Sequence, residues 1–246
     1  MADASAPAFF ARPDGLRLAY RHRPGGGPTL VFLPGYASDM AGTKAQAIDI
    51  WAQAQGQAAL LFDYAGCGTS EGRFEDQTLV GWRDDALLLI DALTEGPIIL
   101  IGSSMGGWLM LLVALARPER IAGLVGIAPA PDFTDWGFSD AVKAILMTEG
   151  RIVAPSDHAD APLITTRAFW ESGQSNLLLD APIALDCPVR LLHGQADVDV
   201  PWAVSLRLAE VLAGSDIRVT LVKDGDHRLS RDSDIALLLA TVAEIA

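Results

Sequence analysis

Gly102-Ser103-Ser104-Met105-Gly106-Gly107 lies between two apolar runs, residues 97–101 (PIILI) and residues 108–116 (WLMLLVALA). The hexapeptide contains the pattern Gly-x-Ser-x-Gly, with Ser104 at its centre. A buried strand before this pattern and a helix after it are typical of a nucleophile elbow, a sharp turn that exposes a serine hydroxyl. Glycines two residues before and after the serine allow the strand and the helix to approach closely. The stretch therefore predicts that Ser104 is a nucleophile facing a helix N-terminus.

Apolar runs and helical patterns alternate on both sides of this stretch. We expect strands over 29–33, 58–62, 97–101, 121–127, 189–193 and 217–222, and helices over 44–55, 78–93, 106–117, 202–212 and a last segment ending at 245. Residues 16–21 follow an Asp14-Gly15 turn signal and predict an early antiparallel hairpin. Continuous Val, Ile and Leu runs are typical of strands buried on both faces. The fold class predicted is α/β, with a mostly parallel sheet flanked by helices.

One segment departs from this alternation. Residues 131–180 contain no convincing strand and lie between two sheet strands, so they predict a small helical cap inserted into a single domain that spans residues 1–246. Two interpretations of the aromatic residues in this segment stay open: they pack the cap onto the body, or some of them line an acyl pocket. These residues are Phe133, Trp136, Phe138, Phe169 and Trp170.

Composition excludes several classes of partner. The chain has 246 residues, half of them hydrophobic, and a net charge of −13, which disfavours nucleic acid and anionic membranes because both attract basic patches. The longest apolar stretch, residues 105–116, is shorter than the roughly 20 residues that span a bilayer. Residues 1–10 lack the features of a signal or transit peptide.

Cys67 and Cys187 are expected to be reduced, in a cytoplasmic protein. Nothing in the sequence indicates the oligomeric state.

A serine nucleophile needs a general base, and the base needs an acid to orient it. In this kind of fold the three residues occur in the order Ser, Asp or Glu, His. The acid we predict is Asp197, with Asp199 as the alternative, because both follow the expected strand 189–193 and catalytic groups gather at the carboxyl ends of strands. The base we predict is His227, between the last strand and the last helix.

Three other histidines fit this role less well. His22 belongs to the early hairpin and is expected to be exposed, and His158 lies between acidic residues of the cap. His193 ends a strand and is expected to form hydrogen bonds within the scaffold.

An oxyanion hole requires two backbone N–H groups. We expect one from Met105, the residue after the nucleophile, and the other from Tyr36, in the loop after an early strand. The sequence has neither a His-Glu-x-x-His motif nor a paired-cysteine motif, so no metal and no other cofactor is expected.

Over essentially its whole length the chain resembles the α/β-hydrolase superfamily. Within it, the resemblance is to the mitochondrial α/β-hydrolase-domain-containing protein 10 family of animals. That family's members are serine esterases that cleave S-palmitoyl thioesters and acyl glucuronides. The resemblance implies that its nucleophile, acid and base fall on Ser104, Asp197 and His227. This chain departs from the wider superfamily at Pro34-Gly35, where many members of the superfamily have His-Gly. The matching segments are Pro34-Gly35-Tyr36 with residues 42–45, residues 62–66, 102–110 and 190–194, Val200-Pro201-Trp202 and Asp226-His227-Arg228.

The function expected is therefore that of a cofactor-free serine hydrolase, which cleaves carboxylic esters or thioesters of a small-molecule or acylated substrate through an acyl-enzyme intermediate. The alternatives are another activity of the same fold, such as a peptidase or perhydrolase, and a ligand-binding protein with little turnover. A site for acyl glucuronides is expected to have a positively charged side chain near the pocket, which would bind the carboxylate of the sugar. Lys143, Arg151 and Arg228 are candidates for that group, and each is otherwise a solvated surface charge.

Overall fold

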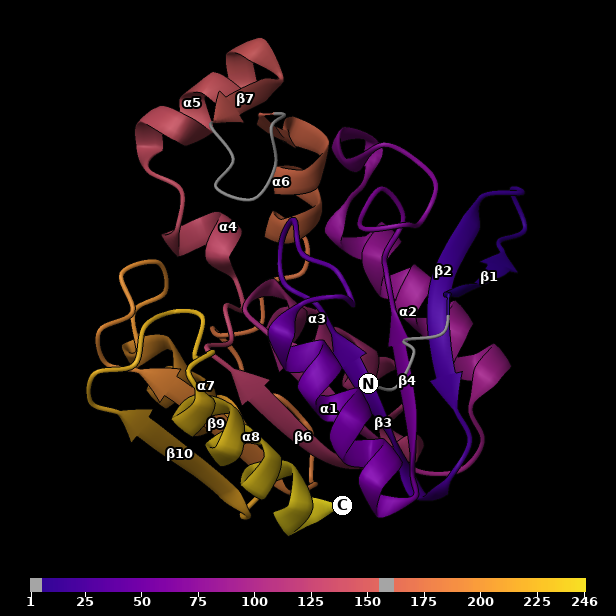
Figure 1. Ribbon diagram of the computed structural model, residues 1–246. Coiled ribbons are helices and arrows are strands. Elements are labelled where there is room, and N and C mark those ends of the chain that lie inside the picture. Colours follow the sequence, from indigo (N-terminus) through magenta and orange to yellow (C-terminus); the bar gives the residue numbers. More distant parts are fainter. Residues whose placement is uncertain (1–5, 155–161) are drawn as a thin grey trace.

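A central sheet of eight strands organises the computed structural model, which describes residues 6–154 and 162–246 (Figure 1). The strands lie in the order β1-β2-β4-β3-β5-β6-β9-β10. β4, β3, β5, β6, β9 and β10 run parallel, whereas β1 and β2 form the antiparallel hairpin predicted at the start of the chain. The bounds are β1 (Ala8–Ala11), β2 (Arg17–Arg23), β3 (Gly26–Leu33), β4 (Gln57–Phe62), β5 (Ile98–Ser103), β6 (Ile121–Ile127), β9 (Val189–Gly194) and β10 (Ile217–Val222).

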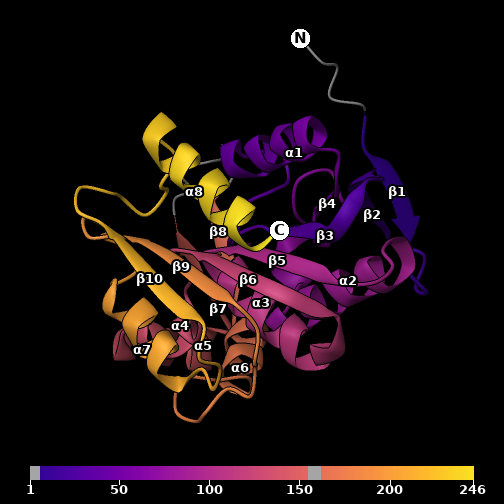
Figure 2. The same cartoon turned by 90° about the horizontal axis from the view of Figure 1, so that it is seen from below.

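Helices cover both faces of the sheet (Figure 2). α1 (Thr43–Gln55) and α8 (Asp232–Ile245) lie on one face, and α2 (Leu79–Leu93), α3 (Met105–Ala116) and α7 (Ala203–Val211) lie on the other. Alternate residues of each strand supply the two cores: in β3, Leu30 and Phe32 pack with α1 and α8, while Val31 and Leu33 pack with α2 and α3. The predicted α/β class with its mostly parallel sheet is therefore confirmed.

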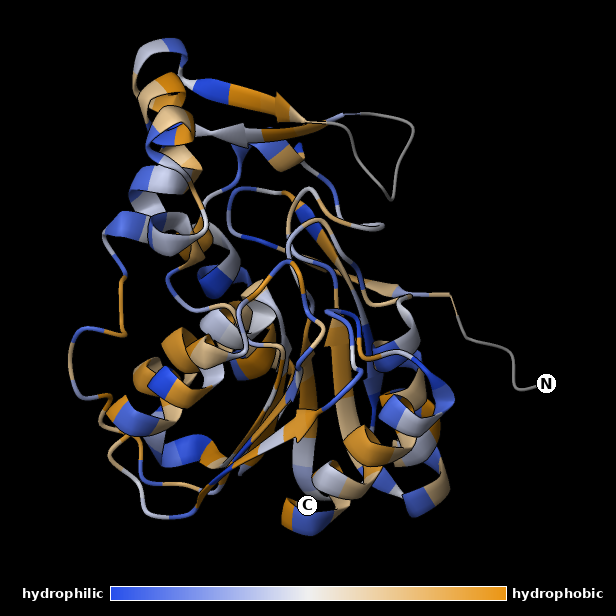
Figure 3. Cartoon of the chain, turned by 90° about the vertical axis from the view of Figure 1, so that its left-hand side faces the viewer, coloured by the Kyte–Doolittle hydropathy of each residue, from blue (hydrophilic) through white to orange (hydrophobic). Residues whose placement is uncertain are grey.

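Burial on both faces explains why these strands were visible in the sequence as apolar runs. β4, β5 and β9 are buried almost throughout, and Figure 3 shows the central strands as mainly hydrophobic. α3 is buried over Met105–Ala114, because it packs on the sheet and against α2. Two short 3₁₀ turns, η1 (Phe74–Asp76) and η2 (Pro118–Arg120), connect elements of this layer.

The segment between β6 and β9 rises above the sheet as a separate layer (Figure 1). It contains the helices α4 (Phe133–Trp136), α5 (Asp140–Glu149) and α6 (Arg167–Gln174). The prediction that it lacks strands was wrong, because β7 (Arg151–Ala154) and β8 (Leu163–Thr166) pair antiparallel. Each strand has only four residues and pairs only with the other, so neither gives the long apolar run that marks a sheet strand.

Asp132 joins the two ends of this segment. Its backbone is left-handed, with φ of 61°, and its carboxylate accepts hydrogen bonds from the backbone N–H groups of Leu178 (2.9 Å) and Leu179 (2.7 Å). The chain therefore leaves and rejoins the body at neighbouring points, as an insertion should. The predicted limits of the cap, residues 131–180, remain a prediction.

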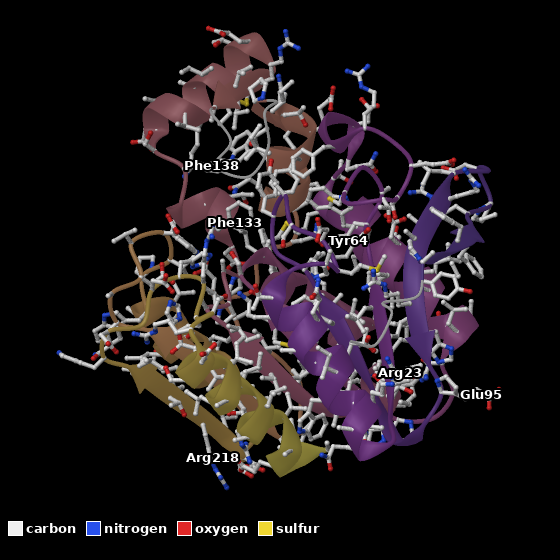
Figure 4. The ribbon with its side chains drawn as sticks, in the orientation of Figure 1. Arg23, Tyr64, Glu95, Phe133, Phe138 and Arg218 are labelled. Atoms are coloured by element: carbon white, nitrogen blue, oxygen red, sulfur yellow. The ribbon has the colours of Figure 1, made fainter. Side chains whose placement is uncertain are left out.

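The aromatic residues of the cap pack against the body and against each other. Phe169 is buried, with its ring centre 5.0 Å from that of Tyr36, and Phe133 lies 5.9 Å from the same ring. Phe138 contacts Phe133 edge to face, and Figure 4 shows both on the cap. The indole N–H of Trp170 donates to the carbonyl of Thr134 (3.1 Å), within the cap. These contacts favour the packing interpretation of the aromatic residues.

Candidate active site

Ser104 occupies the sharp turn between β5 and α3. Its φ of 55° and ψ of −121° place it in a conformation that residues with side chains rarely adopt. The glycines around it are required by close backbone contacts: a Cβ on Gly102 would lie 2.3 Å from the carbonyl oxygen of Gly106, and a Cβ on Gly106 would lie 2.0 Å from that of Leu33. The predicted reason for the glycine spacing is therefore visible in the structure.

His227 lies beside Ser104, in the loop between β10 and α8. Its Nε2 is 3.1 Å from Oγ of Ser104, and its Nδ1 is 2.8 Å from Oδ2 of Asp197. Two bonds shape the loop around it: Asp226 accepts the N–H of Leu229 (2.9 Å), and Nζ of Lys44 donates to the carbonyl of Arg228 (2.6 Å). The second bond attaches the histidine loop to the first turn of α1.

Asp197 is the better placed of the two candidate acids. Its side chain is fully buried, and its Oδ1 accepts the backbone N–H groups of Asp199 (2.9 Å) and Val200 (2.8 Å). Burial alone would raise its pKa, but hydrogen bonds from His193, His227 and Val200 outweigh burial and hold the pKa well below its usual range. Asp199 is exposed, and it contacts Asp197 through its backbone.

Of the two residues predicted to form the oxyanion hole, Met105 directly follows Ser104 and Tyr36 lines the same pocket as Ser104. Met105 is the first residue of α3, and Tyr36 belongs to the loop after β3. This loop lies against the serine, since a Cβ on Gly35 would be 3.3 Å from Cβ of Ser104. The phenol oxygen of Tyr36 forms a hydrogen bond of 2.8 Å with Oγ1 of Thr165, in β8. The loop is therefore attached to the cap.

A pocket of about 440 Å³ opens beside Ser104 and His227. Apart from these two residues its side chains are mostly short and polar or charged, and none of the cap aromatics lines it. They include Ser38, Asp39, Thr43, Lys44, Arg228 and Ser230.

Lys44 and Arg228 supply positive charge to this pocket. Burial and the adjacent charge of Arg228 lower the pKa of Lys44. Of the basic residues proposed from the sequence, only Arg228 lines the pocket; Lys143 pairs with Asp135 (3.3 Å) and Arg151 begins β7. Sequence reasoning missed Lys44, although residues 42–45 were among the segments that carried the family resemblance.

The other histidines have different surroundings. His22 is exposed on β2, as predicted. His193 is buried at the end of β9 and forms hydrogen bonds within the scaffold, also as predicted. His158 lies outside the described residues.

One group of side chains in the described ranges has the composition of a metal site. Ligand atoms of Asp197, Asp199 and His227 lie within 4.8 Å of one another. Asp197 and His227 are already bonded to each other, however, so an ion there would compete with that hydrogen bond.

A mostly parallel sheet with a serine on a strained strand-to-helix turn, beside a histidine and a buried carboxylate, is the arrangement of an α/β hydrolase. Residues 28–149 match the family model described as the alpha/beta hydrolase fold. Human mitochondrial palmitoyl-protein thioesterase ABHD10 is 40% identical over 242 residues, which cover 97% of this chain and 79% of the human protein. The structure of alpha/beta hydrolase domain-containing protein 10 from mouse is similar over 98% of both chains, with a TM-score of 0.90 and 38% identity. A structure from Agrobacterium vitis S4 has a TM-score of 0.89 at 38% identity, over 97% of both chains. The chain belongs to the α/β-hydrolase family, in the branch that includes ABHD10.

The predicted cytoplasmic location is contradicted by these relatives, whose names describe them as mitochondrial. The prediction rested on two cysteines expected to be reduced and on residues 1–10, which lack the features of a signal or transit peptide. Reduced cysteines indicate a reducing compartment without saying which one. Among the residues described, no helix has both the length and the apolar character that crossing a bilayer requires.

Proposed function

We propose that this protein is a serine hydrolase that cleaves carboxylic thioesters and esters, with Ser104, His227 and Asp197 as its catalytic triad. The observation that carries the proposal is the continuous line of hydrogen bonds from Oγ of Ser104 through the His227 ring to the Asp197 carboxylate. The relatives support the choice of reaction, since they are named palmitoyl-protein thioesterases.

In this mechanism His227 Nε2 takes the hydroxyl proton as Oγ of Ser104 attacks the acyl carbon. Asp197 holds the Nδ1–H tautomer and stabilises the imidazolium that forms. The backbone N–H groups of Met105 and Tyr36 receive the charge of the tetrahedral oxyanion. His227 then protonates the departing thiolate or alkoxide, and water, activated by the same histidine, hydrolyses the acyl-enzyme and restores the hydroxyl of Ser104.

The polar pocket favours a polar leaving group. Hydroxyl groups of Ser38, Thr43 and Ser230 can bind hydroxyls of a substrate, and Lys44 and Arg228 can attract a carboxylate. An acyl glucuronide combines both features, so it is the second candidate substrate class beside S-acyl thioesters.

Ser104→Ala tests the proposal directly. We expect kcat on a short-chain ester to fall by about 10⁴-fold or more, as in other triad knockouts, and labelling by a fluorophosphonate probe to disappear. Comparing kcat/KM for one acyl group on a thiol, a simple alcohol and a glucuronide identifies the preferred leaving group. Unchanged ester turnover in Ser104→Ala would refute the proposal.

The rival functions give different results in the same experiments. A ligand-binding protein would show little labelling and negligible turnover even in the wild type. A peptidase would prefer amide substrates over matched esters, and a perhydrolase would require hydrogen peroxide.

A further inference from the structure

We propose that His193 is a positioning residue for catalysis, which acts through Asp197 and is itself oriented by Ser205. The inference rests on the proposed role of Asp197 as the acid of the triad. It concerns a buried histidine that the mechanism above does not use.

His193, in β9, contacts two other parts of the fold: the loop that holds Asp197, and α7. Its side chain is fully buried at the end of β9, with Nε2 lying 3.2 Å from Oδ2 of Asp197 and 3.0 Å from the carbonyl oxygen of Val200. Its Nδ1 lies 2.7 Å from Oγ of Ser205, in α7. The ring therefore connects β9, the loop that holds Asp197, and α7. It contacts Asp197 at Oδ2, the same oxygen that bonds Nδ1 of His227.

The neighbours of the His193 ring determine which of its two nitrogens carries the hydrogen. Both neighbours of Nε2, a carboxylate and a carbonyl, are acceptors, so Nε2 carries a hydrogen and donates it. In the neutral ring Nδ1 is then an acceptor, and the hydroxyl of Ser205 donates to it. The opposite tautomer would bring a lone pair against Oδ2 of Asp197.

This arrangement places two histidine nitrogens against one oxygen of Asp197, Nδ1 of His227 at 2.8 Å and Nε2 of His193 at 3.2 Å. The bond from His227 changes during the reaction as that ring gains and loses a proton, whereas His193 supplies a constant donor from the other side. With both backbone donors on Oδ1, three hydrogen bonds and the contact from His193 determine where the carboxylate points. Loss of the bond from His193 would leave Oδ2 less well aligned with Nδ1 of His227.

Two substitutions of similar size separate donation from packing. His193→Gln keeps an N–H donor at about the distance of Nε2, whereas His193→Met fills the space without one. We expect His193→Met to lower kcat by about ten- to a hundred-fold, in line with loss of a hydrogen bond to a charged group, while KM changes less than about two-fold. His193→Gln should recover most of the loss. Equal losses in both variants would overturn the proposal.

A double-mutant cycle with Asp197→Asn tests whether His193 acts through the acid. If it does, adding His193→Met to Asp197→Asn lowers kcat by less than about three-fold, because the group being positioned is already lost. Multiplication of the two separate losses would contradict it.

Ser205→Ala covers the case in which His193→Met fails to fold. It removes only the hydroxyl that orients the ring, and we expect kcat to fall by about three- to ten-fold with KM retained. Unchanged kcat would count against the proposal.

Proton NMR of the His227 Nδ1–H separates this proposal from the proposed function. Hydrogen bonding to Asp197 moves that resonance downfield whether or not the protein turns over an ester. We expect the resonance to shift upfield in Ser205→Ala and to keep its position in Ser104→Ala. A wild type that neither hydrolyses esters nor reacts with fluorophosphonate would refute the proposed function, whereas an unmoved resonance in Ser205→Ala would refute the role of His193.

Discussion

Asp197→Asn removes the charge that faces His227 and leaves nearly all of the side-chain volume in place. The two interacting atoms are 2.8 Å apart, and the carboxylate is fully buried. With an effective dielectric constant of about 20 and charges separated by about 3 to 4 Å, the ion pair formed in the transition state is worth about 4–6 kcal/mol. Each 1.36 kcal/mol is ten-fold in rate, so kcat should fall by about 10³- to 10⁴-fold.

Asp199→Asn is the matched control, since it makes the same chemical change two residues away. The side chain of Asp199 is exposed to solvent, which screens its charge, and its backbone N–H still donates to Asp197 after the substitution. We expect the kcat of Asp199→Asn to stay within about three-fold of the wild-type value, because removing a solvent-exposed charge changes interaction energies by less than about 1 kcal/mol.

The assay is steady-state turnover of a short-chain ester by both variants, with thermal unfolding to verify that each is folded. In Asp197→Asn the amide oxygen can still accept the backbone N–H groups that now bind Oδ1 of Asp197, so the loop should keep its shape. A larger loss in Asp199→Asn than in Asp197→Asn, or more than a tenth of wild-type kcat in Asp197→Asn, would refute the assignment of the acid.

Three further predictions concern the pocket, the cap and the pH dependence of stability. Lys44→Met should lower kcat/KM for an acyl glucuronide about five-fold more than for a neutral ester of the same acyl group, because both substrates lose the bond that attaches the histidine loop to α1 and only the glucuronide also loses an ion pair; equal effects on both substrates would exclude a role in leaving-group recognition. Tyr36→Phe and Thr165→Val should each lower the free energy of unfolding by about 1 kcal/mol in urea titrations, and the double variant should lose little more than either alone, because both remove the same hydrogen bond; fully additive losses would show that the bond contributes nothing. Burial raises the pKa of Asp85 to about 6 although Arg12 pairs with it, so the folded state binds a proton that the unfolded chain has released between about pH 4 and 6, and stability falls as pH rises through this range. The rise in pKa corresponds to about 3 kcal/mol of unfolding free energy. Between pH 4 and 7 the wild type should lose this amount of stability relative to Asp85→Asn. A difference in unfolding free energy between the two proteins that stays constant over this pH range would contradict the prediction.

The central strands of the sheet could be predicted from the sequence because β4, β5 and β9 are buried almost throughout and therefore read as continuous apolar runs. The elbow is the clearest case, since the backbone contacts of Gly102 and Gly106 impose the residue types that flank Ser104. The strands β7 and β8 could not be predicted in this way, because four residues that pair only with each other leave little trace in the hydrophobic pattern.

The residues of the candidate site could likewise be predicted only in part. Ser104, Asp197 and His227 could be proposed because each follows a predicted strand, and the carboxyl ends of parallel strands lie at one edge of a sheet. Lys44 reaches the pocket from the first turn of a helix that begins ten residues after β3, so its position depends on how the intervening loop folds. Likewise, the sequence indicated that His193 would be bonded within the scaffold, but only the fold brings its Nε2 to the carboxylate of Asp197.

The left-handed backbone of Ser104 has a consequence for how stable this protein can become. Its φ of 55° and ψ of −121° suit glycine, and any other residue held there destabilises the folded state by about 1–3 kcal/mol. That is a sizeable share of the roughly 5–15 kcal/mol by which domains are typically stable. Folding alone would therefore favour a glycine at this turn, although this chain has a serine there. If Ser104 is the nucleophile, as proposed, the same residue that supplies the reactive hydroxyl also lowers the thermal stability of the fold.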